Sequence, residues 1–126
     1  MVRDRVEVHR VAEHVWVVAL VGEHDLSTAD AVRGAIGEAF AGGSKIVFDL
    51  SDASFIDRTV LAAMMEGAAS AREQEDDEFV VVARPGSAPR RLLDLAGAAF
   101  SMDVFESRDA ALAALPGMGA ATPPEA

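Results

Sequence analysis

The order of apolar segments predicts an α/β fold, in which about four helices cover a mixed, mostly parallel sheet of four to five strands. Short runs rich in valine and isoleucine, typical of buried strands, alternate with segments whose apolar residues recur at helical spacing. The first two strand segments follow each other directly and should form a hairpin. The expected order is therefore β-β-α-β-α-β-α-β-α.

The amino-terminal part of the chain predicts a hairpin followed by a helix. Residues 6–8 alternate apolar and charged and predict a short strand, which should end in a turn at residues 11–13. Residues 15–21 form a valine-rich run that predicts a strand buried on both faces. Ser27 and Asp30 have the spacing of a capping box. They precede one apolar helical face, which two successive glycines end: Val32, Ala35, Ile36, Ala39 and Phe40.

The middle of the chain predicts two further buried strands with a helix between them. Residues 45–50 have the first strand pattern, and residues 51–57 are expected to form a loop. Asp57 is a suitable N-cap for the helix that follows, and residues 79–83 give the next strand, of the parallel type. The predicted buried face of the helix consists of Leu61, Met64, Met65 and Ala68.

The carboxyl-terminal part predicts a helix, a short strand and a last helix. Ser87 and Pro89 are typical of a helix start, and Leu92, Leu95 and Ala96 are expected to face inward. Residues 102–105 predict the strand. Ser107 is expected to cap the last helix, whose apolar residues are Leu112 and Leu115.

Length and composition predict one domain over residues 1–115 and a disordered tail over residues 116–126, which are rich in Gly, Pro and Ala. Lys and Arg number 11 against 21 Asp and Glu, and a net charge of −10 argues against binding to nucleic acid or anionic lipid. The chain has no cysteine, which excludes disulfides and zinc-thiolate sites. No apolar run is long enough to span a bilayer, so we expect a cytoplasmic protein without membrane insertion.

Catalytic and metal-binding motifs are weak. His9, His14 and His24 lack the spacing of a metal site, so no metal is expected. Residues 23–25, Glu-His-Asp, could act as an acid–base cluster in an enzyme or a ligand carrier. However, no recognisable nucleophile motif accompanies them, and a polar turn is the expected role. A phosphorylatable receiver domain would need more acidic residues than Asp49 and a lysine late in the chain. We therefore expect no enzyme activity and no cofactor.

Four segments, in order, resemble the STAS domain family and its anti-sigma-factor antagonists. Residues 21–29 resemble the family's G-E-x-D turn, and residues 46–57 resemble its strand and loop that end in Phe-Ile-Asp. Residues 89–97 resemble a late helix, and residues 104–112 resemble the closing strand and helix. The resemblance covers about residues 5–115 and implies a protein-binding, non-enzymatic domain. The implied partner is an anti-sigma factor or a histidine-kinase-like serine kinase.

The resemblance also implies a switch, from which this sequence departs. In such antagonists a serine follows the Asp of Phe-Ile-Asp, and the partner kinase phosphorylates it at the start of a helix, where the helix dipole favours anionic charge. Here Arg58 occupies that position, Thr59 follows it, and Val60 replaces a glycine. Phosphorylation control is therefore doubtful. Thr59 is either a displaced phosphoacceptor or a helix-start threonine bonded to nearby backbone.

The surface implied for partner binding consists of Asp25, Ser54, Asp57, Arg58, Thr59, Val60 and Leu61. Two functions remain open for it. The first is a partner-switching antagonist that sequesters an anti-sigma factor and frees a sigma factor. The second is a phosphorylation-independent scaffold or accessory subunit of a signalling or transport complex. In either role we expect a monomer or a weak dimer.

Overall fold

The computed structural model describes residues 4–115 and confirms the predicted α/β fold. Its sheet has the order β1-β2-β3-β4-β5, with β1 antiparallel to β2 and all other pairs parallel. The predicted tail, residues 116–126, lies outside the described residues. The elements are β1 (Arg5–Ala12), β2 (Val15–His24), α1 (Leu26–Gly42), β3 (Lys45–Ile56), α2 (Arg58–Arg72), β4 (Glu78–Val82), α3 (Ala88–Leu95), the 3-10 turn η1 (Ala98–Phe100), β5 (Asp103–Phe105) and α4 (Arg108–Ala114).

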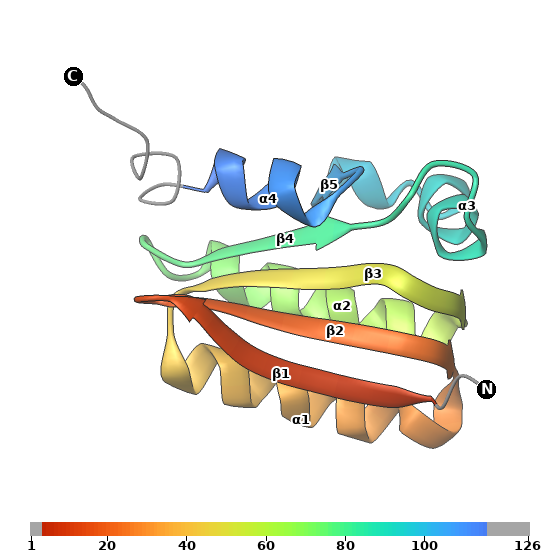
Figure 1. Ribbon diagram of the computed structural model, residues 1–126, viewed down its shortest axis with the longest axis horizontal. Helices are drawn as coiled ribbons and strands as arrows, with labels where there is room; N and C mark the ends of the chain where they lie inside the picture. Colours follow the sequence, from red (N-terminus) through yellow and green to blue (C-terminus); the bar gives the residue numbers. More distant parts are fainter. Residues whose placement is uncertain (1–3, 116–126) are drawn as a thin grey trace.

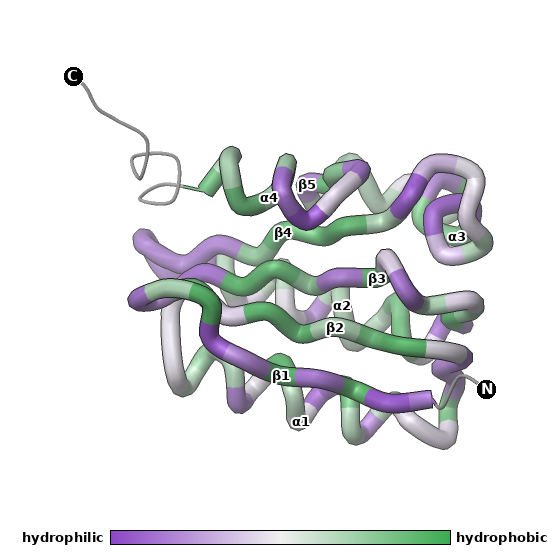
Figure 2. The backbone as a smooth tube through the Cα atoms, in the orientation of Figure 1, coloured by the Kyte–Doolittle hydropathy of each residue, from purple (hydrophilic) through white to green (hydrophobic). Residues whose placement is uncertain are grey.

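The sheet is covered on both faces. Helices α1 and α2 lie on one face and α4 lies on the other (Figure 1). Because successive side chains of a strand point to opposite faces, one set of alternate residues packs towards α1 and α2, as Val18 and Phe48 do. The other set, which includes Val17 and Val47, packs towards α4. Strands β2 and β4 and the first half of β3 are therefore largely apolar, whereas the edge strand β1 is largely polar (Figure 2).

Three strands, β1, β2 and β3, are longer than predicted. β1 runs to Ala12, so the hairpin turn falls at Glu13 and His14, and His14 has a positive φ of 69°. β3 continues to Ile56, so the prediction of a loop at residues 51–57 was wrong. The physical reason is that β2 also extends, to His24, and its last residues pair with the second half of β3 through two shifts in register. As a result, β2 and β3 end side by side, with His24 paired to Ile56.

The start of α1 also differs from the prediction. Asp25 is its N-cap, and the capping box pairs Asp25 with Thr28 rather than Ser27 with Asp30. The backbone N–H of Ser27 donates to Asp25 Oδ1 at 2.9 Å, and the N–H of Asp25 donates to Thr28 Oγ1 at 3.3 Å. Asp25 can hold this position because its backbone is extended, as an N-cap requires.

Three side chains predicted to face inward are exposed. Met65 on α2 is 42% exposed, because Leu61, Met64 and Ala68 already fill the face that packs on the sheet. Leu95 is 86% exposed and Ala96 is also exposed. The inward side chains of α3 are instead those of Pro89 and Leu93, with Leu92 half-buried. The N-caps predicted for α2, α3 and α4, which are Asp57, Ser87 and Ser107, are confirmed.

Candidate protein-docking site

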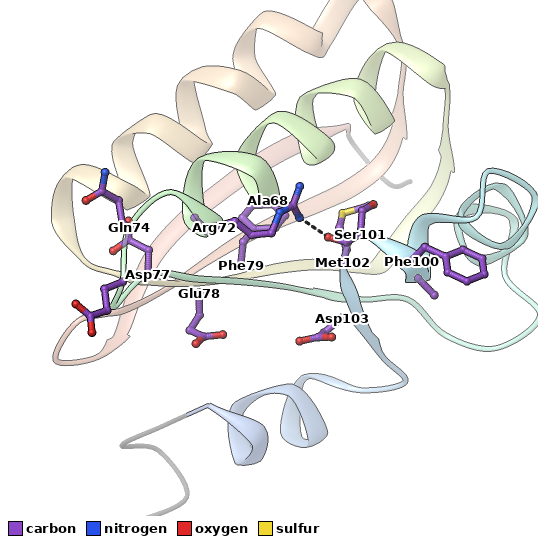
Figure 3. Close-up of a pocket in the computed structure, with 13 residues that line it drawn as sticks. Ala68, Arg72, Gln74, Asp77, Glu78, Phe79, Phe100, Ser101, Met102 and Asp103 are labelled. Atoms are coloured by element: carbon purple, nitrogen blue, oxygen red, sulfur yellow. Dashed lines mark hydrogen bonds between the residues drawn. The ribbon is translucent and has the colours of Figure 1, made fainter.

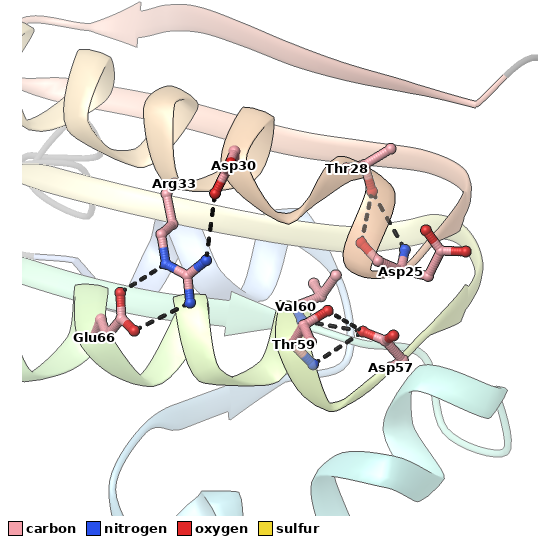
Figure 4. A network of polar contacts seen from close by, with 8 residues as sticks. All are labelled: Asp25, Thr28, Asp30, Arg33, Asp57, Thr59, Val60 and Glu66. Atoms are coloured by element: carbon pink, nitrogen blue, oxygen red, sulfur yellow. Dashed lines mark hydrogen bonds and ion pairs between the residues drawn. The ribbon is translucent and has the colours of Figure 1, made fainter.

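Two helix starts meet at the carboxyl ends of β2 and β3. Asp25 caps α1 directly after β2, and Asp57 caps α2 directly after β3. The strands are neighbours, and His24 pairs with Ile56, so the residues that follow lie side by side. Figure 4 shows both aspartates at this end of the molecule. The sequence predicted each helix start, and the pairing of the extended strands brings them together.

The carboxylate of Asp57 organises the start of α2. Its Oδ1 accepts hydrogen bonds from the N–H of Thr59 at 2.9 Å, from Thr59 Oγ1 at 2.6 Å and from the N–H of Val60 at 3.2 Å. Asp25 Oδ1 has a matching arrangement with Ser27, whose N–H lies at 2.9 Å and whose Oγ lies at 2.6 Å. In each helix the N-cap aspartate accepts backbone N–H groups that the helix leaves free, and it also accepts the hydroxyl of the residue two positions later.

Both aspartates have lowered pKa values, which keeps them ionised at neutral pH. Partial burial raises the pKa of Asp57, but hydrogen bonds from the Thr59 hydroxyl and from the N–H groups of Val60, Thr59 and Leu26 outweigh it. The pKa of Asp25 is lowered mainly by the hydroxyl and N–H of Ser27, against the repulsion of the Asp57 charge. The N–H of Leu26 belongs to α1, so the start of that helix also contributes to the lowered pKa of Asp57.

Arg58 and Thr59, the two residues after Asp57, differ in their surroundings. The Arg58 side chain is exposed, and no acidic group among residues 4–115 lies within ion-pair distance of it. Thr59 is half-buried, and its hydroxyl donates to the Asp57 carboxylate. Its partner is thus a side chain, not the backbone group considered from the sequence. A phosphate on Thr59 would replace the hydroxyl hydrogen and so remove this bond.

The remaining residues of the implied surface divide between the surface and the core. Ser54 is exposed, whereas Val60 is fully buried and Leu61 is 7% exposed. The valine that replaces a glycine therefore points into the core rather than towards a partner. Two apolar side chains that the sequence did not single out are exposed here: Leu26 is 73% exposed and Phe55 is 45% exposed. Leu26 directly follows the N-cap Asp25 and is the first residue of α1. The predicted capping box of Ser27 and Asp30 started the helix later, so Leu26 was not recognised as a helix residue.

His24 has a structural role in this site. Its ring is buried, with Nε2 donating to the carbonyl oxygen of Val21 at 3.0 Å and Nδ1 lying 3.1 Å from Thr28 Oγ1. The neighbouring Glu23 is exposed, and its N–H donates to Asp4 Oδ1 at 2.9 Å. The Glu-His-Asp cluster therefore forms a hydrogen-bonded strand-to-helix turn. Nowhere in residues 4–115 do three or more His, Asp or Glu side chains gather as a metal site would require.

Comparison with known proteins identifies the family. The STAS domain matches residues 7–111, and the chain belongs to the STAS domain family. An anti-sigma factor antagonist from Mycobacterium paratuberculosis is 32% identical, with a TM-score of 0.73, and the match covers 91% of this chain and 94% of that one. No curated protein sequence gave a significant match.

Two more distant structures share the fold. A putative anti-sigma factor antagonist from Thermotoga maritima is 18% identical with a TM-score of 0.73, and the match covers 84% of this chain and 90% of that one. The phosphorylated form of the Bacillus cell fate determinant SpoIIAA is 21% identical with a TM-score of 0.57, at 85% and 96% coverage. Anti-sigma factor antagonists are non-enzymatic regulators, in agreement with the expectation from the sequence. Among the described residues, no helix combines the length and apolar character needed to cross a membrane.

Proposed function

We propose that this protein is an anti-sigma factor antagonist, which binds an anti-sigma factor in the cytoplasm and thereby frees a sigma factor. The observation that carries the proposal is the 32% identity, over nearly the whole of both chains, to the mycobacterial antagonist. The paired helix starts support it, because they present exposed charged and apolar side chains on a rigid, hydrogen-bonded frame.

In this proposal the residues of the site have different roles. Asp25 and Asp57 fix the two helix starts, and Ser54 and Arg58 are exposed to the partner. Val60 and Leu61 contribute through the core, by anchoring the first turn of α2 against the sheet. A rigid first turn favours binding, because less conformational entropy is lost when the partner docks.

Control by phosphate at position 58 is absent from this proposal, since arginine has no hydroxyl group. Thr59 is the candidate phosphoacceptor in its place. A phosphate there would replace the 2.6 Å bond to Asp57 with a charge of about −1.5 to −2 beside two ionised carboxylates. The resulting repulsion would disturb the start of α2 and weaken docking. Without modification of Thr59, the protein would act as a constitutive antagonist.

The proposal is tested by mixing the purified protein with each anti-sigma factor of its own organism, with and without ATP. Binding is measured by isothermal titration calorimetry, and the 55–65 segment is read by peptide mass spectrometry. Specific binding without ATP supports the antagonist, and phosphate on Thr59 that abolishes binding would show a displaced switch. Absence of binding to every anti-sigma factor would contradict the proposal.

A second function, a phosphorylation-independent scaffold in a larger signalling or transport complex, is favoured by the same Arg58. The two functions differ in the assembly that they predict. Size-exclusion chromatography of the native complex would show a large assembly insensitive to ATP for the scaffold, and a small complex of antagonist and anti-sigma factor for the first proposal.

A further inference from the structure

The most exposed large apolar side chains of the described residues lie close together in the chain, at the end of α3 and in η1. Leu95 is 86% exposed and Phe100 is 97% exposed. Ala96 and Ala99, between them in sequence, are exposed as well. These four residues are called the α3–η1 patch. Most large apolar side chains of a small domain are at least partly buried. An exposed cluster of them is a common sign of an interaction surface.

The backbone holds the patch in place. The N–H groups of Ala96 and Phe100 donate to Leu92 and Gly97 at 3.0 and 3.1 Å, and Gly97 has a positive φ of 68°, which glycine adopts without strain. The inward positions of this turn are already filled by Leu93 and Ala98, each 1% exposed. Leu95 and Phe100 are thus directed outward by an ordered turn.

Phe100 points away from the rest of the molecule. It stands at the rim of an open hollow of about 720 Å³ between the end of α2, β4 and η1, and Figure 3 shows its ring directed outward, away from Phe79 and Met102. Gly97, in the same turn, is close to this side chain: a Cβ added there would lie 3.5 Å from the ring.

Helix α3, whose last turn leads into the patch, lies at the same end of the molecule as the candidate docking site. Helix α3 packs against β3. It follows β4, whose carboxyl end is at the same edge of the sheet as those of β2 and β3. Figures 1 and 4 both place α3 beside the junction of β3 and α2 that carries Asp57. A protein docked on the two helix starts would therefore reach the patch by extending along α3.

Charge and area decide which molecule covers the patch. A second copy is disfavoured, because each copy carries a net charge of −10 and a few side chains fall well short of the roughly 800 Å² per partner of a stable interface. The docking site alone also offers too little apolar area for a stable interface, since its large exposed apolar side chains are Leu26 and Phe55. Together, the two surfaces give an interface with separate apolar anchors beside the two ionised N-caps, Asp25 and Asp57.

We propose that the α3–η1 patch is part of the interface with the anti-sigma factor, which receives Leu95 and Phe100 in an apolar groove within a surface of net positive charge. The positive charge complements the acidic chain and steers the two proteins together. This inference rests on the proposed function, and it names the chemistry of the partner: apolar at one point of contact and basic around it.

The test compares serine substitutions at the patch with a matched control at the other end of the sheet. Leu95→Ser, Phe100→Ser and the double variant are titrated into an anti-sigma factor that binds the wild-type protein. The control is Val11→Ser, whose side chain is 38% exposed at the hairpin end of β1. Each patch substitution is expected to weaken binding about tenfold, and the double variant about a hundredfold. The control should change binding by no more than about twofold.

Folding of each variant is checked by thermal unfolding, and the exposed patch substitutions should leave the midpoint nearly unchanged. Wild-type affinity in the double variant would overturn the inference while leaving the antagonist function intact. Failure of the wild-type protein to bind any anti-sigma factor would overturn the proposed function, and this inference with it. Sedimentation of the free protein gives the remaining outcome: self-association lost in the double variant would show a second copy on the patch and contradict the inference.

Discussion

The hydroxyl of Thr59 lies 2.6 Å from Oδ1 of Asp57, the same oxygen that accepts the N–H of Thr59 and of Val60. This relationship links the candidate phosphoacceptor to the cap of the helix on which it stands. The hydroxyl is part of the structure of the α2 start, and any modification of it would change that start.

Removal of the Asp57 carboxylate is expected to destabilise the protein. Asp57→Ala leaves two N–H groups of α2 without their acceptor, and we expect a loss of about 1–2 kcal/mol in the free energy of unfolding. Asp57→Asn keeps an oxygen acceptor and should lose less. Urea unfolding followed by circular dichroism measures both variants. An Asp57→Ala midpoint equal to that of the wild type would show that the cap does not stabilise α2.

The same carboxylate predicts a dependence of stability on pH. Its pKa in the folded protein is below the ordinary value of 3.8, so its stabilisation is complete above that value and is lost as the pH falls through the lower, folded value. The difference in unfolding free energy between the wild type and Asp57→Asn should therefore be constant from neutral pH to about pH 5 and shrink towards pH 2. Urea titrations across this range test it, and a difference that grows with acid would contradict the lowered pKa.

A third prediction concerns the attachment of α4 to the sheet. Arg108 Nε donates to Asp49 Oδ2 at 2.8 Å, and the Asp49 side chain is only 6% exposed. Arg108→Ala leaves that carboxylate with the N–H and hydroxyl of Ser51 as its remaining donors. We expect a loss of about 1.5–3 kcal/mol, the usual value for a hydrogen bond to a charged group.

Hydrogen exchange of the Arg108→Ala variant should rise mainly in α4. Asp109→Ala serves as its control, because Asp109 is an exposed residue of the same helix. An equal rise in exchange across the whole sheet would indicate that the ion pair stabilises the entire domain rather than the helix.

A fourth prediction concerns the end of β2. Gly22 has a positive φ of 88°, and a Cβ there would collide with the side chain of Asp4. Asp4 also accepts the N–H of Glu23, so the collision would disturb the strand that leads to Asp25. Gly22→Ala should destabilise the protein by more than about 1 kcal/mol. Gly34→Ala on α1 is the control, because a Cβ there meets open space, and it should stabilise the protein slightly.

Much of the fold was predictable because each element has a local signal. The valine-rich runs gave the buried strands β2, β3 and β4, and the N-caps of α2, α3 and α4 came from single polar residues. The second half of β3 was not predictable in this way, because its polar residues form a strand only through pairing with β2. Tertiary contact overrides local propensity there.

The sequence predicted which residues form the site, but not which of their side chains are exposed. Helical spacing alone placed Leu95 inward, whereas the short α3 packs through Pro89 and Leu93. Resemblance pointed to Val60 as a changed contact surface, yet its side chain is buried in the core. Exposure depends on how each helix is rotated against the sheet, which a pattern of apolar residues specifies only approximately, as Met65 on the long helix α2 also shows.

Displacement of a sigma factor measures the central claim most directly. A fluorescently labelled sigma factor is bound to its anti-sigma factor, and the protein is added in increasing amounts without ATP while anisotropy is recorded. We predict that the wild type and Val11→Ser release the labelled sigma factor in parallel, and that Leu26→Ser, which removes the most exposed apolar side chain of the docking site, releases it at least about tenfold less effectively. Undiminished release by Leu26→Ser would place docking elsewhere on the molecule, and no release by the wild type from any anti-sigma factor would contradict the antagonist function.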